Sequence, residues 1–130
     1  MNKKISLYIN TSETKPIILV LFSHSKKTIK KFSIKKEYLS QKLLLLIDHF
    51  LKDNHQSFKN LHNIIIYSGP GSYTSLRIGI SVANALAFGL DIPVYSFKKQ
   101  EKLETLLTKI TKNNIQNFSK PASVFYQQHI

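Results

Sequence analysis

The stretch most able to carry chemistry is a glycine-rich turn between an apolar run at residues 64–67 and a helical pattern. Its residues are Ser68-Gly69-Pro70-Gly71-Ser72-Tyr73-Thr74. Gly69 and Gly71 allow backbone angles that a side chain would forbid, and Pro70 fixes its own φ. The N–H groups of such a turn, at the positive end of a helix, can bind an anion. The same residues could form a tight structural corner, and both interpretations stay open here.

Arg77, in the first part of the following helix, is the second candidate. The 19 lysines and arginines of the chain include only this one arginine. A guanidinium presents a planar fork of donors that can hold a carboxylate, a phosphate or carbonyl groups at two points. A structural salt bridge is the alternative interpretation.

Other catalytic motifs are absent from the sequence. The turn lacks the lysine of a Walker P-loop and the third glycine of a dinucleotide fingerprint, and there is no Gly-x-Ser-x-Gly elbow. The histidines, at positions 24, 49, 55, 62 and 129, have no metal-ligand spacing. No pair of carboxylates suggests acid–base catalysis. We therefore predict no catalytic residue, no metal site and no cofactor.

Size and composition predict one globular domain. The chain has 130 residues, 42% of them hydrophobic, and no cysteine. Its net charge of +12 favours contact with nucleic acid, although the lysines are scattered in pairs without a basic block. A general bias towards Lys, Asn and Ile would give the same charge without selection for binding. No apolar run approaches the ~20 residues of a membrane span, so we expect a soluble, cytoplasmic protein without a membrane partner.

Hydrophobic periodicity predicts the elements that position the turn. In order, they are strands at 5–9, 17–22 and 28–34, a helix at 39–51, a strand at 64–67, a helix at 74–88, a strand at 94–97 and a helix at 99–110. Gly89 is expected to end the second helix. The order β-β-β-α-β-α-β-α predicts an α/β domain over residues 1–112, with a mixed sheet covered by helices. Residues 113–130 are expected to be a polar tail, either disordered or holding one strand near 122–126.

The first two predicted helices have features of a partner interface. The apolar arc of the first is wider than packing on one sheet requires, and a row of small residues along the second would admit another helix. The second helix is nearly all apolar or small, so we expect burial on most of its sides. The positions expected at the interface are Leu39, Leu43, Leu44, Ile47, Leu51, Ser75, Gly79, Ala83 and Ala87.

Three segments together resemble the TsaB (YeaZ-type) family of threonylcarbamoyladenosine-tRNA biosynthesis subunits. They are Gly69-Pro70-Gly71-Ser72-Tyr73-Thr74, Leu76-Arg77-Ile78-Gly79 and Ala87-Phe88-Gly89-Leu90-x-Ile92-Pro93-Val94. The resemblance covers about residues 4–110 and corresponds to the N-terminal half of the family. It implies the actin/sugar-kinase/Hsp70-like fold, which is ribonuclease H-like.

The resemblance also implies a function. Family members help to make N6-threonylcarbamoyladenosine at position 37 of tRNA, as non-catalytic partners of the catalytic paralogue TsaD, and the ATPase TsaE joins the complex. It implies that the helices at 39–51 and 74–88 contact a TsaD-like partner, and that tRNA is an indirect partner of this chain. A homodimer is a further implied state. The alternative is a stand-alone basic RNA-binding protein.

The sequence departs from this family at several places. Asn10 stands where the family usually carries an aspartate, so a carboxylate that could hold a metal or a water is gone. Ser75 replaces a glycine, and Leu39-Ser40 replaces a His-Ser pair. Family members are also roughly twice as long. We therefore expect that no cleft between two halves forms within this chain.

Overall fold

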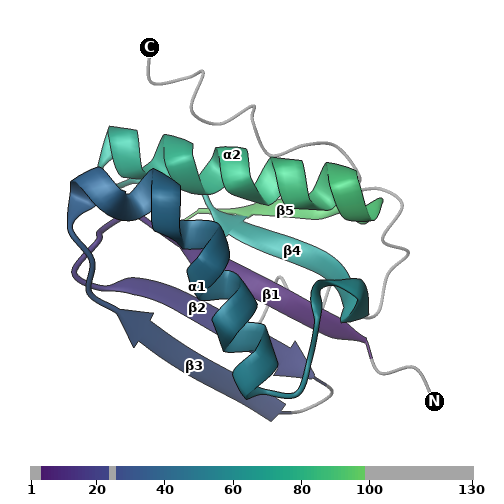
Figure 1. Cartoon of the computed structure of the whole chain (residues 1–130). Helices are drawn as coiled ribbons and strands as arrows, with labels where there is room; N and C mark the ends of the chain where they lie inside the picture. The colour runs from purple at the N-terminus through teal and green to yellow at the C-terminus, as the bar shows by residue number, and fades with distance from the viewer. Residues whose placement is uncertain (1–3, 24–25, 99–130) are drawn as a thin grey trace.

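The fold is organised around a five-stranded sheet with the strand order β3-β2-β1-β4-β5 (Figure 1). The structure is a computed structural model, which describes residues 4–23 and 26–98. The elements are β1 (Ile5–Asn10), β2 (Ile17–Ser23), β3 (Lys26–Phe32), α1 (Leu39–Asp53), β4 (Leu61–Tyr67), α2 (Tyr73–Leu90) and β5 (Val94–Phe97). Two short 3-10 turns, η1 (Lys36–Tyr38) and η2 (Phe58–Asn60), precede α1 and β4.

The pairing of the strands confirms the predicted mixed sheet. β1, β2 and β3 form an antiparallel meander, and β1, β4 and β5 run parallel to one another. The seven predicted helices and strands between residues 5 and 97 are all present, with ends displaced by a few residues. The third predicted helix, at 99–110, and the predicted tail, at 113–130, lie outside the described residues.

Alternation along the strands divides the interior into two clusters. Leu7 and Ile9 of β1 point towards α1 and α2, where they meet core residues such as Ile47 and Ile80. Tyr8, between them, points to the other face of the sheet, because successive side chains of a strand alternate. The cluster on that second face consists of Tyr8, Val20, Ile65, Tyr67, Leu76, Tyr95 and Phe97.

The outer side of α2 is exposed, and the expectation that this helix is buried on most sides was wrong. Its buried positions, such as Ile80 and Ala83, lie against the sheet. A helix that rests on one face of a sheet buries a single stripe, whatever the polarity of its other positions. The outer stripe, exposed along the helix, consists of Thr74, Arg77, Ser81, Ala85 and Phe88.

The end of α2 also differs from the prediction. Gly89 lies within the helix, which continues to Leu90, and Asp91 takes the left-handed conformation with φ 57°. The N–H of Ile92 donates to the carbonyl of Ala87 at 3.0 Å, and the N–H of Asp91 donates to that of Phe88 at 3.3 Å. Aspartate tolerates this conformation better than most residues do, so the turn needs no glycine.

Candidate partner-binding site

The glycine turn links the end of β4 to the start of α2. Gly69 has φ 127°, a region that residues with a side chain rarely adopt. A methyl group added at Gly71 would lie 2.5 Å from Cβ of Ser12, which belongs to the turn after β1. The phenol of Tyr67 donates to the carbonyl of Pro70 at 2.9 Å. Each glycine of the turn therefore has a structural reason to be there.

Contacts with the turn after β1 hold the beginning of α2 in place. The hydroxyl of Thr11, which is fully buried, donates to the carbonyl of Ser75 at 2.7 Å. The N–H of Ser72 donates to the carbonyl of Ser12 at 3.0 Å. A methyl group added at Gly79 would collide with the Thr11 hydroxyl. The Thr11 contact therefore requires a glycine one turn after Ser75.

Asn10 has a structural role at the position where the family usually carries an aspartate. Its side-chain oxygen accepts from the N–H of Ser12 at 2.9 Å, and its side-chain nitrogen donates to the hydroxyl of Tyr8 at 3.2 Å. A carboxylate could not make the second bond as a donor. Burial raises the pKa of Tyr8 to about 12, with the Asn10 hydrogen bond acting in the opposite direction.

These contacts favour the structural interpretation of the predicted turn, Gly69 to Thr74. The Ser72 N–H, one of the donors that an anion would need, is already used by Ser12. Ser72 precedes the first residue of α2 and so occupies the capping position, but its hydroxyl donates to that of Ser75 at 3.3 Å and makes no capping bond to the backbone. Anion binding at this turn stays a prediction.

Arg77 lies on the exposed side of α2. Its guanidinium lies over the ring of Tyr73, 5.3 Å from the ring centre. The same side chain lines a surface pocket of about 300 Å³ between α1 and α2. The other lining residues are Ser40, Thr74, Ile78, Ser81 and Val82. Arginine thus belongs to the rim of an open depression between the two helices.

Most positions predicted at a partner interface lie in the interior of this chain. Only Leu44 is exposed, at 47% of its surface. The eight buried positions are Leu39, Leu43, Ile47, Leu51, Ser75, Gly79, Ala83 and Ala87. The wide arc of α1 and the small-residue row of α2 serve the packing of these helices on the sheet and around Thr11. The prediction that these eight residues form an exposed interface was therefore wrong.

A different set of apolar side chains is exposed on the two helices. Phe88 of α2 has 90% of its surface exposed, and Leu45 of α1 is exposed beside Leu44. Tyr73, at the start of α2, and Tyr38, just before α1, are exposed as well. Phe88 could have been identified from the sequence, because it lies at helical spacing from the polar residues Arg77 and Ser81. Both helices lie on one side of the sheet (Figure 1), so these residues belong to one side of the molecule.

The described residues offer no metal centre. Among them, no group of three histidine, aspartate or glutamate side chains is arranged to hold an ion. Neither of the described α-helices is long and apolar enough to cross a bilayer. The outer surface of α1 and α2, with its pocket and its exposed apolar side chains, is therefore the candidate site.

Comparisons with known proteins identify related chains. The family model of TsaD, tRNA N6-adenosine threonylcarbamoyltransferase, matches residues 27–119. TsaB from Bacillus subtilis, a tRNA threonylcarbamoyladenosine biosynthesis protein, is 36% identical over 70 residues, which are 54% of this chain and 30% of that protein. TsaB from Haemophilus influenzae is 28% identical over 88 residues, covering 68% of this chain and 36% of that protein.

A solved structure supports the same relationship. YeaZ from Pseudomonas aeruginosa superposes with a TM-score of 0.65 and 25% identity, covering 73% of this chain and 43% of the YeaZ chain. The matches thus span less than half the length of these relatives. The fold is the predicted actin/sugar-kinase/Hsp70-like, ribonuclease H-like type, and the chain belongs to the TsaB (YeaZ-type) family.

Proposed function

We propose that this chain is a non-catalytic partner subunit in the synthesis of N6-threonylcarbamoyladenosine in tRNA. It binds and stabilises a TsaD-like catalytic relative through the outer surface of α1 and α2. The names of the relatives support the pathway, since two of them are tRNA threonylcarbamoyladenosine biosynthesis proteins. A TsaE-like ATPase would associate with this chain as part of the assembled complex.

The observation that carries the proposal is the exposure of Phe88. A phenylalanine with 90% of its surface in water is unfavourable in an isolated protein and typical of the apolar anchor of an interface. Leu44, on α1, adds a second apolar side chain on the same side of the sheet. Fully burying such side chains contributes about 1.5–3 kcal/mol each.

The pocket between the helices gives the surface a shape that a partner can fit. Ser40 of α1 and Arg77, Ser81 and Val82 of α2 line it. A side chain entering this depression would meet apolar contact from Val82 and hydrogen-bond donors from Arg77. Aromatic and arginine side chains beside a pocket are common at the energetic centre of interfaces.

Capture of a TsaD-like protein by the whole chain tests the proposal. We expect wild-type chain to retain the partner on a column, and Phe88→Asp combined with Leu44→Asp to lose it, because two buried carboxylates would be left without partners. Ile29→Asp is the control, since Ile29 is an apolar residue on β3 whose exposure, at 51%, is similar to that of Leu44. Retention by the double variant, or equal loss by the control, would contradict the proposal.

A second copy of this chain is the competing occupant of the same surface. Size-exclusion chromatography of the chain alone and with the partner separates the two cases. A heterodimer formed at the expense of a homodimer supports one shared surface. A homodimer that persists within the complex would place the partner elsewhere.

A further inference from the structure

The edge strand β3 and the residues after it form a strongly basic surface. Residues 26–36 have the sequence KKTIKKFSIKK, which contains six lysines and no acidic residue. We call this surface the basic ribbon, and its members are Lys26, Lys27, Lys30, Lys31, Lys35 and Lys36. The first two of the three lysine pairs lie on β3, at one edge of the sheet, and the third follows the end of that strand.

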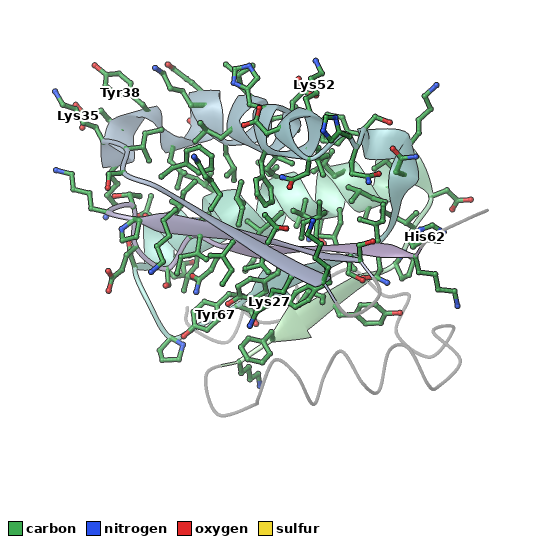
Figure 2. The ribbon with its side chains drawn as sticks, turned by 90° about the horizontal axis from the view of Figure 1, so that it is seen from below. Lys27, Lys35, Tyr38, Lys52, His62 and Tyr67 are labelled. Carbon is green, nitrogen blue, oxygen red and sulfur yellow. The ribbon has the colours of Figure 1, made fainter. Side chains whose placement is uncertain are left out.

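The register of the sheet spreads these lysines over both faces of β3. Lys30 pairs with Leu19, a residue of the cluster beneath the helices, whereas Lys31 pairs with Ile18, which packs on the second face. Figure 2 shows Lys35 on the side of the helices and Lys27 on the opposite side of the sheet. Lysines four residues apart on one face are separated by about 13 Å along the strand.

Composition and protection of the edge do not account for this concentration. Lysines on an edge strand discourage pairing with other strands, but the basic ribbon continues past the end of β3 through Lys35 and Lys36. Other surfaces also carry lysines, such as Lys42 and Lys52 of α1, but no other stretch of 11 residues in the sequence contains six of them. Two acidic residues lie nearby. Glu37 follows Lys36 in sequence, and Glu13 belongs to the loop whose Thr14 carbonyl accepts from the N–H of Ile34. Their two negative charges are far fewer than the six positive charges of the basic ribbon.

We propose that the basic ribbon binds the phosphate backbone of RNA, with tRNA as the source, an identification that rests on the proposed function. Closely spaced lysines that release counterions from phosphates supply affinity without reading sequence. A flat anionic membrane could meet only one face of a strand at a time. A folded RNA, with phosphates on both sides of a groove, can reach Lys30 and Lys31 together.

The basic ribbon and the outer stripe of α2 lie apart on the molecule. β3 is one edge of the sheet, and α2 packs near the opposite edge, over β4 and β5 (Figure 1). RNA on the basic ribbon would therefore leave the outer stripe of α2 accessible. The chain would extend the RNA-binding surface of the complex as well as support the catalytic subunit.

Salt-dependent binding of an unmodified tRNA transcript by the whole chain tests the proposal. The variant Lys30→Gln/Lys31→Gln/Lys35→Gln is compared with Lys4→Gln/Lys52→Gln/Lys59→Gln, which loses the same charge at exposed positions elsewhere. We expect the first to bind about tenfold more weakly, with a slope of log K against log salt reduced by about 2 to 3. The second should stay within about twofold of wild type.

Three results would overturn the proposal. They are equal weakening by the two triple variants, an absence of salt-dependent tRNA binding by the unmutated chain, and ribbon-dependent binding to anionic lipid vesicles without binding to tRNA. The wild-type salt titration does not depend on whether a variant folds, and circular dichroism checks the variants.

Partner capture by the same proteins separates this proposal from the preceding one. The basic ribbon variant should capture the TsaD-like protein as wild type does. Phe88→Asp/Leu44→Asp should lose the partner and keep tRNA. Loss of capture by all proteins would count against the proposed function alone, whereas failure of the tRNA comparison would count against the basic ribbon alone.

Discussion

The outer stripe of α2 and the basic ribbon of β3 are both exposed, but they differ in what they can bind. The 18 residues of α2 include one charged side chain, Arg77, and the exposed Phe88 in the last turn. The 11 residues 26–36 include six lysines. Lysine is strongly hydrated and rarely lies at the centre of a protein interface, where aromatic residues and arginine are common. The two surfaces therefore suit different partners, a protein and a polyanion.

The two surfaces also differ in how they are supported. The start of α2 is held by the Thr11 hydroxyl and by the Ser72–Ser12 bond. Among the described strands, β3 pairs only with β2. A helix that presents a shaped surface to a partner must be held in a fixed position. Long lysine side chains are flexible and can reach phosphates even when the strand beneath them is less firmly held.

The largest expected effect comes from breaking the support of α2. Gly79→Ala places a methyl group against the buried Thr11 hydroxyl, and we expect a loss of about 1–3 kcal/mol in the free energy of unfolding. Gly89→Ala is the control, since its added methyl group meets nothing within 4 Å and should stabilise the helix by about 0.5–1 kcal/mol. Urea denaturation measures both. Equal stabilities for the two variants would contradict the role of Thr11.

An intermediate effect is expected from adding one lysine to each of the two surfaces in turn. Ala85→Lys puts a lysine on the outer stripe of α2, and we expect roughly tenfold weaker partner capture, because about 1.4 kcal/mol of desolvation is added. Ser33→Lys adds the same charge beside the basic ribbon, and should strengthen tRNA binding a few-fold without changing capture. Titration calorimetry and filter binding measure the two affinities. The distinction between the surfaces fails if both variants change both affinities alike.

Titration of the buried tyrosines tests the sheet that both surfaces share. Burial raises the pKa of Tyr8 and of Tyr95 to about 12. Between pH 10 and about 12 the unfolded chain therefore loses these protons while the folded chain keeps them, so stability should fall as the pH rises through that range. Urea unfolding at a series of alkaline pH values measures the fall, and Tyr8→Phe should make it shallower. A stability that stays level to pH 12 would exclude burial of these phenols.

Local pattern was sufficient for the elements and insufficient for their outer surfaces. The alternation at residues 5–9 and the apolar run at 64–67 predicted β1 and β4, because a strand's periodicity depends on its own residues. The interface residues were predicted wrongly because an apolar arc looks the same whether this chain or another protein covers it. Ala83 and Leu43 are buried in the core between the helices and the sheet, whereas Phe88 is exposed to solvent.

The order of helices and strands, the glycine turn and the family could be read from the sequence alone, since these depend on residue types and their spacing along the chain. The tertiary structure shows that Gly79 makes room for Thr11, and that the lysines of residues 26–36 lie on and just after an edge strand. The physical reason is that burial, close contact and summed charge are properties of neighbours in space. The pairing of β3 with β2 places the lysines at the edge of the sheet. The packing of α2 on β4 leaves Phe88 exposed.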